Sequence, residues 1–371
     1  MIVLEGEKIC MPEPCVLGIG KFECFHLGHK ALVSEMMRLA RGDRPAPKLP
    51  GIVNISRQSP NHDIASALGR RNPNHDIASA LVMFEPHPYR VLSDPGYKPL
   101  FTGLERERLA EGLGVDFLLK FPFNRDFAAM PPEDFCRMIF EDLQARAVVV
   151  GMGYRFGYGR MGTVDTLRKA AGEYGAVVRD VALHGGLGHA VAAQEALGHA
   201  TVPHESLAHT TAAQSELDAV HKTSTSTIRE LLGDGMLAGA EKLLGYPFFA
   251  IGEIARGRQL GRTIGFPTIN LYPPVDKFLP GDGVYVSRVC VDGGCYRGVT
   301  NIGVCPTVGG GNAARTIETY LLDFDGGELY GREAKVEFLR FVRPERKFES
   351  LEALKAQILL DCAVAGVRHS G

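Results

Sequence analysis

The apolar residues of this chain change their spacing near residue 245, and this change limits the folds that the chain can adopt. Before that point, short apolar runs alternate with stretches of helical periodicity, as in 15–20 followed by 27–39. After it, short alternating segments are separated by glycine turns. The first pattern indicates a parallel, doubly wound sheet, and the second indicates a small closed antiparallel barrel. We therefore predict an α/β domain over 1–245 and a β domain over 246–371.

These periods also place the individual elements. In the first domain the predicted strands are 15–20, 81–84, 117–120, 147–150 and 177–183, and the predicted helices are 27–39, 104–112, 132–145 and 227–232. In the second domain the predicted strands are 248–254, 268–271, 283–291, 296–302, 316–324 and 334–341, followed by a helix at 351–363. Ligands of a doubly wound sheet lie beyond the carboxyl ends of its strands. We therefore expect the loops after Gly20, Phe84 and Val150 to meet at one edge of the sheet.

Two repeat-bearing segments interrupt the first domain, near 41–80 and 185–220. In the first, residues 57–68 recur as 70–81 at a period of 13. In the second, a short motif recurs at a period of ten and carries His189, His199 and His209. Two copies are too few for a solenoid, although a histidine-rich tract can bind metal. We interpret both segments as loops that grew by duplication.

The net charge and the cysteines restrict the partners and the location. A formal net charge of −2 gives no general attraction to nucleic acid or to an anionic membrane. No apolar run reaches the ~18 residues of a membrane span, and residues 1–15 lack the apolar core of a secretory signal. The eight cysteines contain no C-x-x-C pair. Reduced thiols in a cytoplasm explain them better than a disulfide framework or a zinc site.

A glycine-rich stretch at 261–270, Gly-Arg-Thr-Ile-Gly-Phe-Pro-Thr-Ile-Asn, enters a predicted strand. Side chains two residues apart on a strand point to the same side, so Thr268 and Asn270 present two neutral oxygens to one point. Such oxygens suit a hard cation that carries nucleotide phosphates. Gly261 and Gly265 allow the backbone to approach those phosphates closely, while Pro267 fixes it. The alternative is a hairpin that uses glycine only for its turn.

The stretch 20–29 lies between a predicted strand and a predicted helix. The first N–H groups of a helix are unpaired and the helix dipole is positive there, so this turn can bind an anion. His26 and His29 are three residues apart and can both face a phosphate at that helix end. Two ordinary surface histidines are the alternative.

A second helix start carries Ser224-Thr-Ser-Thr-Ile-Arg229. Hydroxyl groups at the N-cap and an arginine one turn later make another phosphate-binding helix end. Simple capping is the alternative, and it needs only one of these hydroxyls.

One carboxylate stands out in the predicted barrel. Alternation along 317–323 places Glu318 and Tyr320 on one face of a strand, and Ile317, Thr319 and Leu321 on the other. An unpaired carboxylate in such a strand is costly, so Glu318 is either a general base or one partner of a structural ion pair.

Both halves together resemble the prokaryotic family of bifunctional riboflavin kinases/FMN adenylyltransferases, also called FAD synthetases, over nearly the whole chain apart from the two insertions. The second half carries the family's landmarks in order. These landmarks are 261–270, 283–285, 301–303, 306–307, Glu318, 329–331, Arg343 and 347–348. In the first half, 20–29, 85–88 and 224–229 are similar to the family's nucleotidyltransferase motifs. The resemblance implies a Rossmann-like nucleotidyltransferase domain followed by a six-stranded antiparallel riboflavin kinase barrel with a C-terminal helix.

The resemblance also implies roles for particular residues. Thr268 and Asn270 hold Mg²⁺ with the ATP phosphates, Glu318 takes the proton of the riboflavin 5′-hydroxyl, and His26 and His29 stabilise the phosphates during FMN adenylylation. Residues implied to bind ATP are Gly20, Phe22, Gly28, Ser224, Thr225, Ser226, Arg229, Gly261, Gly265 and Pro267. Residues implied to bind flavin are Pro86, His87, Arg155, Phe156, Asn301 and Arg343, the last in a mobile region that closes over the flavin.

Three positions differ from the family's pattern. Glu23 and Cys24 stand where its turn carries Asp and Gly, and Gly153 stands where its loop carries Asp or Asn. Cys24 is strained if the turn needs a positive φ there. The leading hypothesis is an enzyme that makes FMN from riboflavin and FAD from FMN. The alternatives are a kinase with a degenerate first domain, and a non-catalytic flavin-binding protein.

Overall fold

The computed structural model describes residues 1–41, 77–182, 224–257, 261, 264–305 and 314–366. These residues form two compact units. The first unit contains 1–41, 77–95, 106–182 and 224–227, and the second contains 96–105 and 228–366. The repeats at 57–68 and 187–210, with their histidines, lie outside the described residues. The domain boundary at 245 stays a prediction.

A six-stranded sheet forms the first unit, and all of its strand pairs are parallel. Its strands are β1 (Ile2–Glu5), β2 (Cys15–Ile19), β3 (Ala78–Glu85), β4 (Phe117–Pro122), β5 (Ala145–Gly151) and β8 (Val177–Val181). Their order across the sheet is β1-β4-β3-β2-β5-β8. From β2 the chain thus adds β3 and β4 on one side of that strand, and then adds β5 and β8 on its other side. The loops after β3, β2 and β5 therefore follow neighbouring strands, as predicted.

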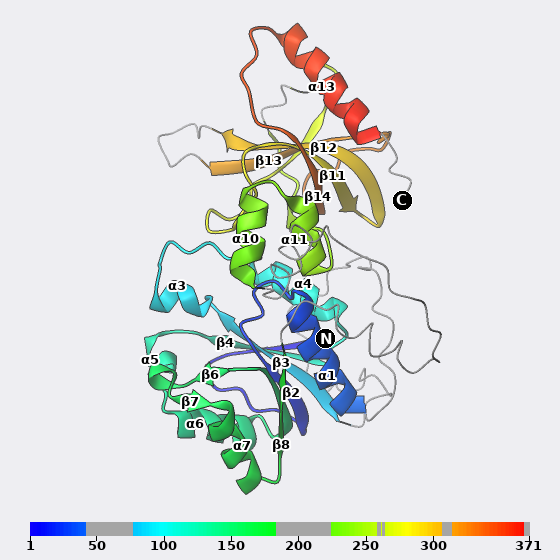
Figure 1. Ribbon diagram of the computed structural model, residues 1–371. Helices are drawn as coiled ribbons and strands as arrows, with labels where there is room; N and C mark the ends of the chain where they lie inside the picture. The colour runs from blue at the N-terminus through cyan, green and yellow to red at the C-terminus, as the bar shows by residue number, and fades with distance from the viewer. Residues whose placement is uncertain (42–76, 183–223, 258–260, 262–263, 306–313, 367–371) are drawn as a thin grey trace, which may run out of the picture. The chain divides into compact units, whose positions relative to one another are not determined.

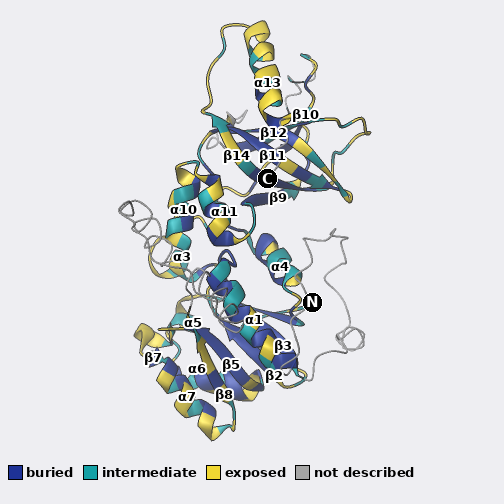
Figure 2. Cartoon of the chain, turned by 45° about the vertical axis from the view of Figure 1, so that its right-hand side comes forward, coloured by how far each residue is buried: buried dark blue, intermediate teal, exposed yellow. Residues whose placement is uncertain are grey.

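Apolar side chains alternate between the two faces of this sheet and form a core on each face. Helix α1 (Leu27–Arg41) packs its buried side chains into one core, which also contains Val16, Leu81 and Val149. A Cβ atom on Gly18 would lie 2.7 Å from Leu81 and 2.9 Å from Met36, so glycine allows α1 to approach the sheet. Leu17 and Ile19 face the opposite core. In Figure 2 the sheet strands are mostly buried.

The remaining helices of the chain's first part are shorter. They are α3 (Pro88–Leu92), α4 (Gly103–Gly112), α5 (Arg125–Ala128), α6 (Pro132–Arg137) with a wider turn at Met138–Asp142, α7 (Val164–Glu173) and α10 (Thr225–Gly233). A small hairpin joins β6 (Arg155–Phe156) to β7 (Gly162–Thr163). The sequence did not predict β1, α7 or this hairpin. Strand β3 begins at Ala78, so the last four residues of the second copy, 78–81, belong to the sheet.

An antiparallel sheet of six strands forms most of the second unit (Figure 1). The strands are β9 (Phe249–Glu253), β10 (Thr268–Leu271), β11 (Gly283–Val291), β12 (Gly294–Cys305), β13 (Ala314–Leu321) and β14 (Glu333–Arg343). Their order is β10-β13-β12-β11-β14-β9, and an isolated bridge between Ala255 and Asn270 links the two edges. The predicted barrel strands are therefore confirmed. Two helices, α11 (Leu237–Leu244) and α13 (Leu351–Gly366), complete the unit.

Buried polar groups in the second unit are paired. The hydroxyls of Ser287, Thr300 and Thr319 form a chain across three strands, with oxygen separations of 2.7 Å at each link. The ammonium of Lys277 lies 2.7 Å from the carboxylate of Glu105, and both side chains are fully buried. Glu105 also accepts a hydrogen bond from the backbone N–H of Ile251. These contacts hold segment 96–105 in the second unit.

One cysteine prediction is wrong. Cys290 and Cys295 form a disulfide, whereas the sequence favoured reduced thiols throughout. The reason is the hairpin between β11 and β12, whose register places these two residues directly opposite each other. The described part of the chain contains no helix long and apolar enough to cross a membrane.

Candidate functional site

A row of polar side chains crosses three neighbouring strands of the second unit. Glu318 on β13 pairs in register with Asn270 on β10 and with Asn301 on β12. Ile317 and Thr319, which flank Glu318 on β13, are buried, while Glu318 itself is half-buried. The predicted alternation of this strand is therefore confirmed. The strand register therefore places one amide, of Asn270 or Asn301, on each side of the Glu318 carboxylate.

The glycine-rich stretch 261–270 leads into this row. Phe266 N–H donates to the carbonyl of Gly261 at 2.7 Å, which closes a tight turn before β10. A Cβ atom on Gly261 would lie 2.2 Å from the Phe266 carbonyl oxygen, so only glycine fits. Gly265 has φ +88 and open space around it. Arg262 and Thr263 lie outside the described residues.

Thr268 and Asn270 fit the donor set that Mg²⁺ prefers. Their side chains lie on the same face of β10, and Asn270 is 4% exposed. A Cβ atom on Gly257 would lie 2.4 Å from the Asn270 amide nitrogen, so glycine leaves room for that amide. Both side chains offer neutral oxygens, and Mg²⁺ completes its coordination with water and substrate phosphates.

The far end of the row approaches the chain that follows β14. The Asn301 amide donates to the Glu345 carboxylate at 3.1 Å. Arg343, the last residue of β14, donates to the Asp361 carboxylate on α13 at 2.8 and 3.1 Å from two of its nitrogens. In this structure Arg343 is therefore held by an ion pair on the C-terminal helix. Its predicted contact with flavin stays a prediction.

In the first unit, His26 and His29 lie together at the start of α1. Their rings stack with centroids 3.9 Å apart, and the exposed fractions are 4% and 6%. The Nδ1 atom of His26 accepts hydrogen bonds from the backbone N–H groups of Gly28 and His29. The sequence-based view that these N–H groups are unpaired is wrong, because His26 caps its own helix. A neutral His26 therefore carries its proton on Nε2.

Burial determines the charge of both histidines. Desolvation lowers the pKa of His26 to about 4 and lowers the pKa of His29 well below its ordinary value, with His26 adding to the effect. Both rings are neutral near pH 7. They can therefore donate hydrogen bonds to an anion but do not add positive charge.

In the turn before α1, the residues with a positive φ are two phenylalanines and not Cys24. Phe22 and Phe25 have φ values of 40 and 41, and Cys24 is not among the residues with positive φ. The two rings stack 5.3 Å apart, and both are buried. Cys24 is therefore no steric obstacle. The Phe22 ring packs against His29, so any contact of Phe22 with ATP has to use its backbone.

The second predicted phosphate site begins α10. The Ser224 hydroxyl accepts from the Thr227 N–H at 3.2 Å and acts as the cap. Thr225 is half-buried with its hydroxyl 3.8 Å from the Cys24 sulfur, and Ser226 is exposed. Arg229 belongs to the second unit, where its guanidinium lies over the rings of Tyr97 and Phe278.

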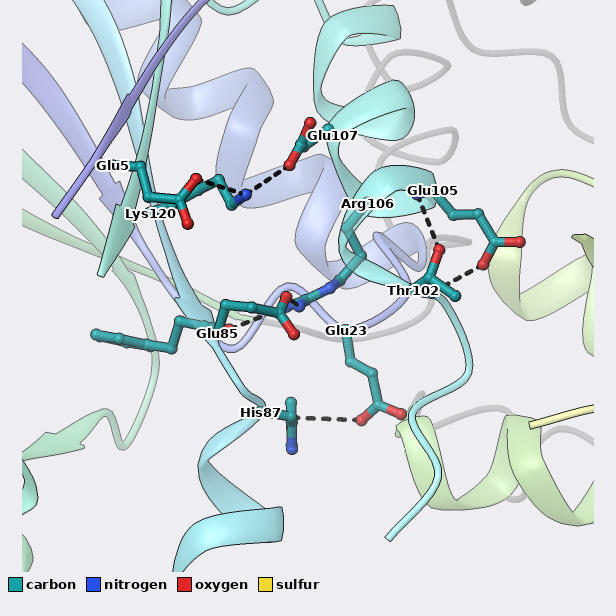
Figure 3. Close-up of polar contacts among 10 residues, drawn as sticks. Glu5, Glu23, Glu85, His87, Thr102, Glu105, Arg106, Glu107 and Lys120 are labelled. Carbon is teal, nitrogen blue, oxygen red and sulfur yellow. Dashed lines mark hydrogen bonds and ion pairs between the residues drawn. The ribbon is translucent and has the colours of Figure 1, made fainter. Parts of the chain in front are cut away.

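The predicted flavin loop after β3 contacts the turn after β2 through two side chains. His87 caps α3 through Nδ1, and its Nε2 lies 3.5 Å from the Glu23 carboxylate; both side chains are 3% exposed. Figure 3 shows Glu23 pointing toward His87. The preceding Glu85–Pro86 peptide bond is cis, and Pro86 is exposed. The family motifs at 20–29 and 85–88 therefore meet at a buried contact between a histidine and a carboxylate.

Sequence reasoning missed one buried cation in this region. Arg106 on α4 is 1% exposed and donates to the Glu85 carboxylate and to the Phe84 carbonyl (Figure 3). Desolvation lowers its pKa, while Glu85 and Glu23 act in the opposite direction. Its position inside a predicted helix gave no sign of this role. Arg106 holds the carboxyl end of β3 next to the predicted flavin loop.

The remaining predicted flavin residues follow β5. Arg155 is exposed, whereas the Phe156 ring is buried against Phe135 at 4.9 Å. Phe156 is thus part of the core. Gly153 has φ +73 with open space around it.

Comparison with known proteins finds a matching family for each half of the chain. The family description Riboflavin kinase matches residues 244–367, and FAD synthetase matches 61–193. The bifunctional riboflavin kinase/FMN adenylyltransferase of Escherichia coli K12 is 32% identical, covering 94% of this chain and 91% of its own. Proteins of that name from Pseudomonas fluorescens and Bacillus subtilis are 32% and 31% identical, covering 95% and 75% of this chain and 92% and 78% of their own.

A solved structure shares the whole fold. The macrolide-efflux protein from Streptococcus pneumoniae aligns with a TM-score of 0.70 at 24% identity, covering 98% of this chain and 99% of that chain. This likeness concerns the fold alone. The identity to the curated relatives over most of both lengths decides the family. The chain belongs to the family of bifunctional riboflavin kinases/FMN adenylyltransferases.

Proposed function

We propose that this chain makes both flavin cofactors from riboflavin and ATP. Its second unit transfers the γ-phosphate of ATP to riboflavin and yields FMN. Its first unit transfers the adenylyl group of ATP to FMN and yields FAD and pyrophosphate. The observation that carries the proposal is the row of Asn270, Glu318 and Asn301 on three neighbouring strands. The family matches to both halves of the chain support the same proposal.

In the kinase reaction, Glu318 accepts the proton of the riboflavin 5′-hydroxyl as that oxygen attacks the γ-phosphate. Thr268 and Asn270 hold Mg²⁺ together with the ATP phosphates, and Asn301 lies beside the flavin. Bound Mg²⁺ neutralises charge on the phosphates. Phosphoryl transfer depends mainly on such positioning and charge neutralisation. Glu318 supplies the one proton transfer, which is typically worth about 10²–10⁴ in rate.

In the adenylyltransferase reaction, the phosphate of FMN attacks the α-phosphorus of ATP and pyrophosphate leaves. His26 donates a hydrogen bond from its Nε2–H to a phosphate oxygen, and His29 assists from the first turn of α1. The hydroxyls of Thr225 and Ser226 add neutral donors at the start of α10. These groups act as fixed donors, and preorganised donors stabilise the charge that develops on the phosphates.

The same proposal covers the partners and the location. Riboflavin, FMN and ATP are the substrates, and nucleic acid and membranes are not partners, in keeping with the net charge of −2. A cytoplasmic location stays a prediction from the sequence.

Chromatographic separation of the flavins tests the proposal directly. Purified protein is incubated with riboflavin, ATP and Mg²⁺, and the products are followed with time. FMN that appears first and is converted to FAD supports both activities. FMN as the end product shows that only the kinase works, and unchanged riboflavin contradicts both assignments.

A further inference from the structure

Three potential metal ligands converge in the first unit. Cys24, His26 and His29 each bring one ligand atom into a group whose members lie within 4.8 Å of one another, and all three residues are buried. Cys24 comes from the turn after β2, and His29 comes from the first turn of α1. A sulfur and two imidazole nitrogens are the ligands that Zn²⁺ and Co²⁺ prefer.

A second observation points to a ligand at this place. The Nδ1 atom of His29 is buried and has no hydrogen-bond partner among the described residues. A buried polar atom without a partner is costly and needs an explanation. A metal ion next to the Cys24 sulfur would satisfy it.

We propose that Cys24, His26 and His29 bind a Zn²⁺-type ion that reversibly blocks the phosphate site of the first unit. Three protein ligands leave one tetrahedral position for water or a phosphate oxygen. Mg²⁺ prefers oxygen ligands, so the ion that accompanies ATP does not compete for this site.

Binding has identifiable costs. The two imidazole rings are stacked at an interplanar angle of 21°, and a metal lies in the plane of each ligating ring, so at least one ring must turn. His26 Nδ1 already accepts two backbone hydrogen bonds, so binding also displaces either these bonds or the proton on Nε2. The Cys24 thiol loses its proton to the solvent. We therefore expect affinity below that of a four-ligand zinc site and rising with pH.

Occupation of the site has a functional consequence, which rests on the proposed function. Ring nitrogens that bind a metal ion no longer donate hydrogen bonds to ATP phosphates. Zn²⁺ should therefore inhibit FAD formation at concentrations that leave FMN formation unchanged.

Cobalt binding to the full-length, metal-free protein, with its Cys290–Cys295 disulfide intact, tests the site without reference to activity. We expect one Co²⁺ per chain with a thiolate-to-cobalt absorption band, displaced by Zn²⁺ and not by millimolar Mg²⁺. The Cys24→Ser variant should lose this band, whereas Cys10→Ser, which changes an exposed cysteine of the same unit, should keep it. The histidine-rich segment near 189–209 contributes no thiolate and cannot mimic the band.

A second variant guards against misfolding of Cys24→Ser. His29→Gln keeps the thiol and removes one ligand, so its Co²⁺ affinity should fall at least tenfold. Absence of the band in the unmodified protein, or equal affinity in His29→Gln, overturns the site.

Inhibition is then measured as the ratio of FAD formed with and without Zn²⁺ in each variant. A Zn²⁺ concentration for half-inhibition at least tenfold higher in Cys24→Ser, with reversal by a chelator, supports the block. Inhibition at equal Zn²⁺ in both proteins overturns it. A cobalt band in a protein that makes no FAD even without Zn²⁺ would leave the site standing and reject the proposed adenylyltransferase instead.

Discussion

The two candidate phosphate sites of this chain are built in opposite ways. In the first unit, the groups lie on loops after neighbouring parallel strands and at helix starts, and His26 and His29 are buried and neutral. In the second unit, Asn270, Glu318 and Asn301 stand on strands, and their alignment comes from the register of β10, β13 and β12.

This difference shows what each site depends on. The strand-borne row needs only the correct pairing of three strands, which a packed barrel enforces along their whole length. The loop-borne site needs supporting side chains, such as the Glu23–His87 pair and Arg106, to hold each loop in place. We therefore expect the first site to respond to changes in its neighbours and in pH, and the second to respond mainly to changes in the row itself.

The largest effect should come from Glu318→Gln. The amide cannot accept the hydroxyl proton, so FMN formation should fall by about 10²–10⁴-fold, while adenylylation of supplied FMN continues. Separate assays started with riboflavin and with FMN measure this. Glu253→Gln, which changes an exposed glutamate at the end of β9, serves as the control. Kinase turnover near normal in Glu318→Gln would rule out its role as base.

The next largest effect should come from His29→Ala. Loss of one preorganised donor typically costs about 10²–10³-fold in rate, so FAD formation should fall by that factor. FMN formation should not change, because His29 belongs to the first unit. The matched control is Arg38→Ala on the exposed side of α1. FAD output equal to that of the unmodified protein would refute the site.

Acid should destabilise the first unit through its neutral histidines. The pKa of His26 in the folded chain is about 4, below the ordinary 6.5, so the unfolded chain binds more protons between these values. Folding stability is therefore unaffected above pH 6.5 and falls as the pH drops toward 4, by about 3 kcal/mol for His26. The lowered pKa of His29 adds in the same direction.

Urea unfolding at several pH values measures this loss of stability, with hydrogen exchange of the α1 amides as the readout for the first unit. The His26→Gln variant should show a weaker dependence on pH over the same range. An unchanged slope in that variant would show that other groups cause the acid sensitivity.

The smallest effect should come from Glu23, which acts through His87. Glu23→Asp shortens the side chain and lengthens the 3.5 Å contact, whereas Glu23→Gln keeps the length and removes the charge. We expect a KM for FMN raised about tenfold in either variant, in line with the ~1.4 kcal/mol of a modest buried contact, with kcat less affected. Steady-state kinetics with FMN as the varied substrate decide this. A change in kcat alone would place Glu23 in the chemical step instead.

The local periods of the sequence determined most of the elements and the classes of both sheets. Alternation along β13 correctly placed Glu318 opposite the buried Ile317 and Thr319, because a strand's side-chain period is fixed by its backbone. The order of motifs identified the family. Sequence reasoning missed β1, a strand of four residues, and α7, a helix of ten residues whose buried side chains are Val164, Leu167 and Ala171.

Only the tertiary structure decided which distant residues meet. Register placed Asn301 beside Glu318, and this pairing leaves no trace in local spacing. The Cys290–Cys295 disulfide differs, because its two residues are five apart across a hairpin turn that the local sequence carries. Burial made His26 and His29 neutral. Tertiary packing placed Glu23 next to His87 and Cys24 next to both histidines. Charge state and ligand geometry depend on the surrounding solvent and on long-range packing, so a linear sequence does not fix them.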